Sequence, residues 1–211
     1  MEKKELDKMK KVKVLLYCTK AKPFLLEHKT DDNQVLYVTT EFGSLYYWRI
    51  NHKKVLNGKI VAECEVETEE IRLSEYTYYD DCKIAYFDTP TLLNGELLYK
   101  SCLDNGELEN YLINQKGYAL HISNLRIFKE PKRCQDDFLY QRKIEPNFYN
   151  VEYFRKAPQN MMKVIDAYGD DEYILISVRP KWLCKILNGE KTIEVRKKVL
   201  KEMLEWVKKY P

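Results

Sequence analysis

Residues 173–198 read YILISVRPKWLCKILNGEKTIEVRKK and carry the clearest structural pattern in the chain. The apolar run Tyr173–Val178 has the length of a buried strand. Pro180–Asn188 follows as a helix, because proline suits the first helical turn and Gly189 suits the left-handed position after the last one. Thr192–Arg196 then alternates apolar and charged residues, as a strand does. The stretch therefore predicts a strand–helix–strand unit near the end of the sequence.

The composition is typical of a globular protein. Hydrophobic residues make up 45% of the 211 residues and charged residues 33%, so the chain can bury a core and lacks a disordered composition. No apolar run approaches the roughly 20 residues that a membrane-spanning helix needs. The first residues, MEKKELDKMKKVKV, are charged where a signal peptide would be apolar. We therefore expect a cytoplasmic protein that does not enter a membrane.

Charge is distributed unevenly along the sequence. Residues 1–29 hold nine lysines against four acidic residues, and residues 171–211 hold ten basic against six acidic residues. Because the whole chain has a net charge of +3, the segment between these ends carries −6. Two basic ends brought together by the fold would favour an anionic partner. The seventeen tyrosines could serve as stacking platforms for bases, or could reflect a composition that simply favours tyrosine.

Several further segments are predicted to be strands. Lys59–Glu67 is the clearest, because apolar residues occupy one face and glutamates the other. Tyr118–Phe128 is long enough to bend around the corner of a barrel. The other predicted strands are Lys13–Tyr17, Val35–Thr40 and Met161–Ile165.

Fewer segments are predicted to be helices. Asp104 and Glu107 have the spacing of a capping box, and the apolar residues after them recur at helical spacing. Residues 197–211 are predicted to form a closing amphipathic helix, whereas residues 129–157 are predicted to be a loop with little regular structure. The expected fold class is therefore mixed α+β, as a small mixed β-barrel with a few peripheral helices.

The strand–helix–strand stretch resembles the opening of an ASCH domain, a member of the PUA-like β-barrel superfamily. Its last part has the form G-x-K-x-x-E-x-R, and the fixed positions are Gly189, Lys191, Glu194 and Arg196. Later parts of an ASCH domain resemble segments that lie earlier in this chain, in the family's order. These segments are KVLLYCTKAKP at 13–23, GKIVAECEVE at 58–67, YALHISNLRIFKEPK at 118–132 and KAPQNMM at 156–162. The sequence is also similar overall to ASCH-like proteins of bacteria and phages.

This order implies a circularly permuted ASCH-like, PUA-like barrel whose first strand, helix and motif come from the C-terminal end of the sequence. Permutation keeps the contacts of a barrel when the chain ends lie close together. The alternative is a complete but degenerate domain over 12–167, followed by a truncated second copy. The permuted domain would span 12–200, with a basic extension at 1–11, a helical insertion at 72–116, the strand–helix–strand unit at 172–196 and a helix at 197–211.

The permuted arrangement implies a basic ligand-binding cleft. Glu194 and Arg196 stand on the same face of one predicted strand, about 7 Å apart, so the arginine can bind a phosphate or a base edge while the glutamate orients it. Lys191 is a flexible cation that partial burial could make reactive. The alternative is a surface ion pair beside a solvated lysine. The predicted ligand-binding residues are Lys20, Lys22, Arg179, Lys191, Glu194 and Arg196.

The resemblance implies two kinds of function. ASCH and other PUA-like domains bind RNA or modified bases, so the first expectation is a module that binds nucleic acid, with RNA favoured, or a nucleoside-like small molecule. Some small ASCH proteins resemble this chain around Lys191 and hydrolyse acetylated cytidine, and others act as ribonucleases. An amidohydrolase or nuclease acting through Lys191 is therefore the alternative. The active threonine of those hydrolases falls where this chain has Glu194, which favours binding over catalysis. We expect Lys191 to stay protonated beside Glu194, because an opposite charge stabilises the charged form.

The remaining chemistry-bearing residues give weaker patterns. The six cysteines lack metal-ligand or disulfide spacing and are interpreted as buried reduced thiols. His121 is interpreted as a core histidine, and Glu63, Glu65 and Glu67 as a solvated strand face. The chain has no phosphate-binding glycine loop and no metal-ligand spacing, so we expect neither a nucleotide or other cofactor nor a metal. The expected oligomeric state is a monomer or a dimer that exchanges its C-terminal tail.

Overall fold

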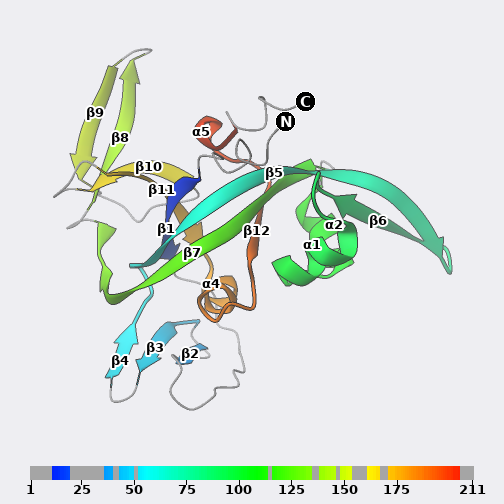
Figure 1. The fold of residues 1–211 in the computed structure, drawn as a ribbon, viewed down its shortest axis with the longest axis horizontal. Coiled ribbons are helices and arrows are strands. Elements are labelled where there is room, and N and C mark those ends of the chain that lie inside the picture. Colours follow the sequence, from blue (N-terminus) through cyan, green and yellow to red (C-terminus); the bar gives the residue numbers. More distant parts are fainter. Residues whose placement is uncertain are drawn as a thin grey trace, which may run out of the picture. The chain divides into compact units, whose positions relative to one another are not determined.

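The computed structural model shows a mixed α+β protein in which most of the regular structure is strand (Figure 1). The predicted α+β class is therefore confirmed. Within the described part of the chain, no helix combines the length and the apolar character needed to cross a membrane. The described residues are 11–19, 36–39, 43–49, 52–113, 116–134, 138–145, 148–153, 161–166 and 171–204.

The chain divides into two compact units, each assembled from separate segments of sequence. Two long strands, β5 (Ile60–Tyr79) and β7 (Lys116–Lys132), contribute residues to both units. The division at Gly189 falls inside the predicted strand–helix–strand stretch, so its helix and its last strand belong to different units. Unit 1 consists of Met1–Val12, Val66–Ser123 and Glu190–Pro211, and unit 2 consists of Lys13–Glu65 and Asn124–Gly189.

Unit 1 combines antiparallel strands with two short helices. β12 (Ile193–Arg196) pairs with β7, and the outer part of β5 pairs with β6 (Cys82–Asp88) as a hairpin. The helix α1 (Asn94–Ser101) packs on β6 and β12, and α2 (Asn105–Tyr111) packs on β6. A short helix, α5 (Lys201–Leu204), follows β12 in the chain. The apolar core of unit 1 consists of Ile71, Ala85, Phe87, Leu92, Leu97, Leu108, Leu112, Ala119, Ile193 and Val195.

The local sequence explains where the two helices of unit 1 begin and end. Asp104 caps α2, because its carboxylate accepts a hydrogen bond of 2.7 Å from the backbone N–H of Glu107. The Glu107 carboxylate in turn accepts one of 3.2 Å from the N–H of Asp104, so the predicted capping box is confirmed. α1 ends at Cys102, whose φ of 54° turns the chain out of the helix. The two helices can therefore follow each other within a few residues.

Unit 2 is built on a sheet in which β1 (Val12–Cys18) and β11 (Glu172–Val178) are parallel neighbours. Val14 lies opposite Ile174, so segments from opposite ends of the sequence pair directly. The strand order in this unit is β7–β5–β1–β11–β10–β8–β9, and the pairs β11–β10, β10–β8 and β8–β9 are antiparallel. The remaining strands of this sheet are β10 (Met161–Asp166), β8 (Phe138–Glu145) and β9 (Phe148–Tyr153).

The apolar character of β1 and β11 follows from their central position. Residues 14–18 and 174–178 are buried throughout, because a central parallel strand is covered on both faces and then reads as a continuous apolar run. The helix α4 (Pro180–Leu187) follows β11 and packs on β2 (Leu36–Thr39). β2, β3 (Leu45–Arg49) and β4 (His52–Val55) form a separate three-stranded sheet in unit 2.

The strand–helix–strand stretch and the other predicted strands are confirmed. α4 begins at Pro180, and Gly189 has the left-handed φ of 77° expected just after a helix. The predicted strands at 13–17, 35–40, 59–67, 118–128, 161–165, 173–178 and 192–196 all contain or overlap an observed strand.

Two predictions about the middle of the chain were incomplete or wrong. Residues 129–157 are not an irregular loop, because β7 continues to Lys132 and the strands β8 and β9 form a hairpin. The segment 72–116 does contain α1 and α2, but it begins as the long β5–β6 hairpin. Its tyrosine- and threonine-rich sequence has the residue types that suit a two-stranded ribbon.

Barrel closure stays a prediction. In the described residues of each unit, the strand order runs from one edge strand to another without returning to its start.

Candidate functional site

Three of the predicted site residues form one charged cluster in unit 1, which we call the β12 cluster: Lys191, Glu194 and Arg196. Glu194 lies between the two cations, with Oε1 3.0 Å from Arg196 Nη2 and Oε2 3.5 Å from Lys191 Nζ. The predicted proximity of Glu194 and Arg196 is therefore confirmed. Lys191 is only 3% exposed, so the alternative of a solvated surface lysine was wrong.

The alternation of β12 places this cluster. Ile193 and Val195 belong to the apolar core of unit 1, so Glu194 and Arg196 point to the opposite face of the strand. β7 approaches β12 closely at Gly117, where a Cβ atom would lie 2.9 Å from the Arg196 carbonyl oxygen and 2.5 Å from a Leu112 methyl carbon. A glycine is therefore needed beside the cluster.

Lys191 is held by the end of α1. Its Nζ donates a hydrogen bond of 2.5 Å to the carbonyl oxygen of Ser101, the last residue of that helix. The backbone N–H of Thr192 donates to the Lys100 carbonyl at 3.0 Å. The C-terminal end of a helix carries partial negative charge and carbonyls without helical partners, so a lysine there is stabilising. No local sequence signal could have shown this contact, because Lys191 and Ser101 are 90 positions apart.

The pKa of Lys191 is shifted by burial as well as by its carboxylate neighbour. Burial lowers the pKa of Lys191 below its ordinary value of 10.5, and this effect exceeds the opposing effect of the Glu194 carboxylate. The predicted carboxylate neighbour is present, and the expected protonation of Lys191 stays a prediction. The arrangement can therefore stabilise a buried cation or, after loss of a proton, present a neutral amine.

Of the other three predicted site residues, the structure describes only Arg179. Arg179 belongs to unit 2, where it is exposed and precedes the first residue of α4. Lys20 and Lys22 lie outside the described residues.

A basic and aromatic surface on α4 was not predicted. The Nζ atoms of Lys181 and Lys185 lie 4.4 Å and 5.9 Å from the centroid of the Trp182 ring. Both distances are within the range of cation–π attraction. The three side chains are partly exposed, and the exposed Arg179 comes just before the helix. We call these four residues the α4 surface. The sequence signal was RPKWLCK, in which the tryptophan stands among basic residues.

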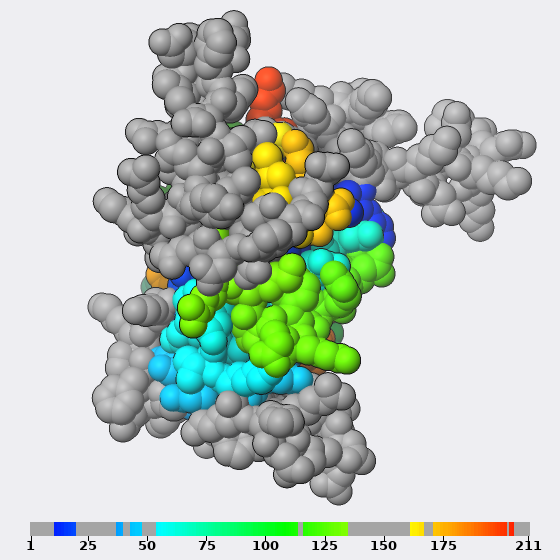
Figure 2. Space-filling model, turned by 90° about the vertical axis from the view of Figure 1, so that its left-hand side faces the viewer, coloured from blue at the N-terminus to red at the C-terminus, as the bar shows by residue number. Residues whose placement is uncertain are grey.

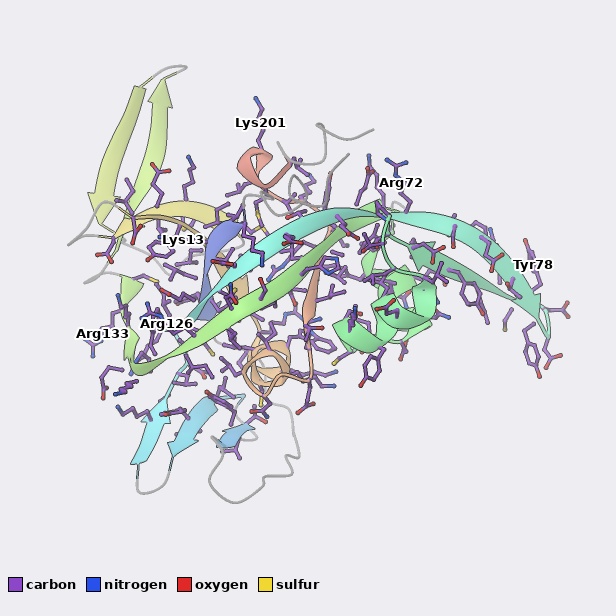
Figure 3. All side chains as sticks on the ribbon, viewed as in Figure 1. Lys13, Arg72, Tyr78, Arg126, Arg133 and Lys201 are labelled. Atoms are coloured by element: carbon purple, nitrogen blue, oxygen red, sulfur yellow. The ribbon has the colours of Figure 1, made fainter. Side chains whose placement is uncertain are left out.

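A second basic and aromatic group lies at the end of β7 in unit 2. Arg126 and Lys132 approach the Phe128 ring, at 5.6 Å and 5.3 Å from its centroid. Figure 2 shows β4 (cyan) beside this part of β7 (green), and the Lys54 ammonium donates to the Lys129 carbonyl at 3.1 Å. Lys54 also pairs with the Glu130 carboxylate. Figure 3 labels Arg126 and Arg133 along this end of the strand.

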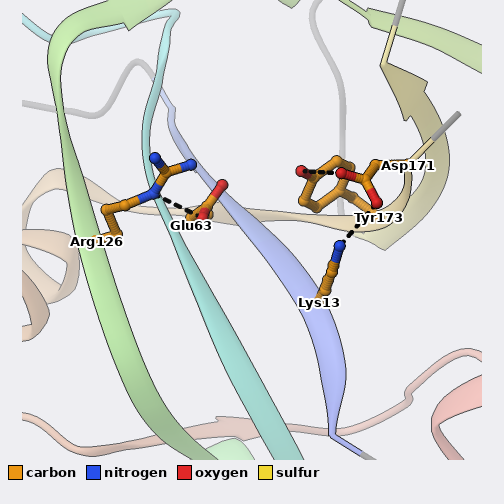
Figure 4. Close-up of polar contacts among 5 residues, drawn as sticks. All are labelled: Lys13, Glu63, Arg126, Asp171 and Tyr173. Carbon is orange, nitrogen blue, oxygen red and sulfur yellow. Dashed lines mark hydrogen bonds and ion pairs between the residues drawn. The ribbon is translucent and has the colours of Figure 1, made fainter. Parts of the chain in front are cut away.

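Exposed ion pairs continue across the same sheet (Figure 4). Arg126 pairs with Glu63 at 2.7 Å, and Lys13 pairs with Asp171 at 2.7 Å. The hydrogen bond from Lys13 lowers the pKa of Asp171, and the same bond raises the pKa of Lys13. Glu63 thus belongs to a partly solvated strand face, as predicted. These paired charges offset each other and leave little for a ligand.

His121 has an acidic partner in unit 1. Its Nε2 lies 3.4 Å from Glu69 Oε2, and the Thr91 hydroxyl donates to Glu69 Oε1 at 2.7 Å. Burial alone would raise the pKa of Glu69, but the neighbouring side chains of His121, Thr89 and Thr91 lower it to about 2. The interpretation of His121 as a core histidine with a partner therefore holds in part, because the side chain stays 25% exposed.

Two buried cysteines, Cys18 and Cys64, are not activated as nucleophiles. Burial raises the pKa of Cys18 and of Cys64 to about 12, whereas a nucleophilic thiol needs a lowered pKa. All six are free thiols, and four of them are buried as predicted, while Cys82 is exposed and Cys102 partly exposed. In the described residues, no group of three His, Cys, Asp or Glu side chains could hold a metal ion.

Comparison with known proteins gave no match to a family model, to a curated protein or to a solved structure.

Proposed function

We propose that this protein binds single-stranded nucleic acid, with RNA favoured, through the α4 surface of unit 2. The observation that carries the proposal is the Trp182 ring with an ammonium group on each of two neighbouring turns, beside the exposed Arg179. Single-stranded nucleic acids bind where bases stack on aromatic rings and phosphates meet basic side chains. The α4 surface supplies both kinds of group on one short helix.

The charge of the two units supports this location. Unit 2 holds 20 basic against 15 acidic residues, whereas unit 1 holds 16 basic against 18 acidic residues. Within unit 1, residues 66–123 hold 11 acidic and only four basic residues. A polyanion is therefore attracted to unit 2 and repelled by the central segment of unit 1. The proposed nucleic-acid contact is therefore on α4, and not on β12, the strand that carries the G-x-K-x-x-E-x-R motif.

We further propose that the fold is a permuted, PUA-like barrel of the ASCH type. The position of β11 between β1 and β10 supports this, because it places a strand from the end of the sequence inside the sheet formed by earlier strands. A truncated second copy would have no such place. In this fold the role of the β12 cluster is to hold β12 in place. Of the predicted site residues, Arg179 belongs to the α4 surface.

The binding proposal is tested by fluorescence anisotropy with labelled, unstructured RNA oligonucleotides. We expect dissociation constants of about micromolar order at low salt, and a slope of log affinity against log salt of about −2 to −4. Trp182→Leu should weaken binding by about 1 to 3 kcal/mol, the typical value for one stacked base. Arg179→Gln should reduce the salt slope by about one.

The matched control is Tyr99→Leu on α1, which removes an exposed aromatic ring next to a lysine in the acidic unit. It should leave RNA affinity unchanged. Equal losses in Trp182→Leu and Tyr99→Leu, or no binding by the wild-type chain at low salt, would refute the proposal.

Hydrolysis at Lys191 is the second candidate, and the lowered pKa of this lysine favours it. A neutral amine can act as a base or nucleophile. However, the Lys191 side chain already donates a hydrogen bond to the Ser101 carbonyl. A substrate would therefore have to displace the end of α1 to reach the lysine. The test is acetate release from acetylated cytidine by the wild type and by Lys191→Met, with folding of both checked by circular dichroism. Turnover that only the wild type shows would establish catalysis at this site.

A further inference from the structure

We propose that the outer part of the β5–β6 hairpin docks on the basic surface of unit 2 in a second copy of this chain. We call this part the arm and define it as residues 74–84. Its two strands are paired up to Tyr79 and Cys82, and the turn residues Asp80 and Asp81 both have positive φ values, 44° and 64°. Such a two-residue turn is the type that favours hairpins. Within unit 1, the hairpin extends past α1 and α2 (Figure 1).

The arm has no core of its own. The apolar core of unit 1 reaches Ile71, Ala85 and Phe87 at its base, and Tyr76 packs partly buried against it, but no residue of 74–84 is fully buried. Residues 77–83, beyond Tyr76, are all exposed, and an isolated two-stranded ribbon is only marginally stable in water. Tyr78 and Tyr79 are each 69% exposed, and Figure 3 shows Tyr78 near the tip. Tyrosine is enriched in the buried centres of protein interfaces, so another molecule is the natural cover for this ribbon.

The charge of the arm indicates which molecule binds it. The arm carries Glu75, Asp80 and Asp81 against a single cation, Lys83, whose Nζ lies 3.5 Å from the centroid of the Tyr76 ring. Nucleic acid would be repelled by these carboxylates. Unit 2 of the same chain has the opposite charge, with 20 basic against 15 acidic residues, and exposes Arg179 beside α4. A second copy therefore offers the arm a complementary surface that every solution of this protein contains.

Reciprocal docking closes the assembly. When the arm of each protomer contacts unit 2 of the other, the result is a closed two-fold dimer, whereas a contact made in one direction only would continue into a chain of protomers. The attraction is between exposed charges, so it should weaken strongly as the Debye length falls from about 10 Å at 0.1 M salt to about 3 Å at 1 M. The arm would thus set the oligomeric state as a function of ionic strength.

Sedimentation velocity on the full chain without nucleic acid tests the proposal. We expect a dimer at about 0.05 M salt and a monomer at about 1 M salt. Asp80→Asn/Asp81→Asn should raise the dimer dissociation constant by about tenfold or more, since asparagine keeps the turn geometry while removing two charges. Tyr78→Ser/Tyr79→Ser should have a similar effect. The control Glu96→Gln/Glu109→Gln makes the same change in net charge on α1 and α2 and should leave the dimer intact.

A charge swap tests the receiving surface. Arg179→Glu should dissociate the dimer, and adding Glu75→Lys to the same chain should restore part of the association. We expect each variant to remain folded, because the changed positions are exposed. Circular dichroism and urea unfolding check this.

Several results would overturn the proposal: a monomeric wild type at low salt, a dimer that survives both arm variants, or equal losses in arm variants and control. A monomeric wild type whose arm binds a synthetic lysine-rich peptide would assign the arm to a different basic protein. Because no nucleic acid is present, these outcomes are independent of the proposed RNA binding.

Discussion

The two units use the same pairs of charged groups in opposite surroundings. In unit 1, Arg196 and Glu194 lie 3.0 Å apart with side chains 15% and 12% exposed. In unit 2, Arg126 and Glu63 lie 2.7 Å apart with side chains 68% and 25% exposed. The exposed pair has the shorter distance, yet water and salt screen it, whereas the buried pair must compensate for lost hydration. Burial, and not distance, therefore decides what each pair contributes.

The largest expected effect comes from removing the buried cation. Lys191→Met leaves the Ser101 carbonyl without its donor and removes one of the two cations beside Glu194. We expect a loss of about 3 to 5 kcal/mol in the free energy of unfolding, as for other broken buried ion pairs. Urea denaturation measures it. Lys13→Met removes a lysine of similar charge from an exposed pair and should leave the urea midpoint unchanged. Equal effects of the two substitutions would refute the conclusion that burial decides what an ion pair contributes to stability.

A pair of glycine substitutions tests how tightly β12 is held. Gly117→Ala places a Cβ against the Arg196 backbone and Leu112, so it should cost about 1 to 3 kcal/mol. Gly95→Ala, on α1, has no neighbouring atom within 4 Å of the new Cβ and should be neutral or stabilising by up to about 1 kcal/mol. Thermal unfolding of both variants provides the measurement. A tolerated Gly117→Ala would mean that β7 and β12 are not as close as described.

Acid titration sharpens the comparison through Glu69. Its folded pKa is lowered from 4.5 to about 2, so its contribution to stability is present above pH 4.5 and is lost as the pH falls toward 2. Partial exposure of this carboxylate reduces the contribution to about 1 to 2 kcal/mol. Glu69→Gln should flatten the stability curve in this window, because it removes the titrating carboxylate. Parallel curves for wild type and Glu69→Gln would show that His121 and the threonines do not stabilise the carboxylate.

The smallest expected effect concerns the exposed arginine pair. Arg126→Gln should change the free energy of unfolding by no more than about 0.5 kcal/mol, and the difference should vanish at high salt. Urea unfolding at two salt concentrations checks this. A loss of several kcal/mol that persists in salt would place Arg126 in the same class as Arg196.

Local signals allowed much of the fold to be predicted. Pro180 and Gly189 marked the two ends of α4, and Asp104 with Glu107 marked the start of α2, because these residues act within one helical turn. Strand alternation identified the inner part of β5 in the same way. The β8–β9 hairpin was missed, since prolines in that region favoured a loop and no strict alternation opposed them.

The candidate site was less predictable, because burial depends on distant segments. The spacing of Glu194 and Arg196 in one strand correctly placed them together. The cover over Lys191 comes from the end of α1, which no pattern around Lys191 describes. The α4 surface was overlooked for a different reason: its residues are adjacent in the sequence, but a tryptophan among lysines is also compatible with a half-buried helix.

The parallel pairing of β1 with β11 has a consequence for synthesis on the ribosome. β1 can pair with β11 only after Ile174, the partner of Val14, has been synthesised about 160 residues later. At a translation rate of about 5 to 20 residues per second, the delay is about 8 to 30 seconds. During that interval one side of β1 and one side of β10 lack the strand that separates them in the finished sheet. The nascent chain therefore presents unpaired strand edges that chaperones would recognise until β11 has been synthesised and has paired.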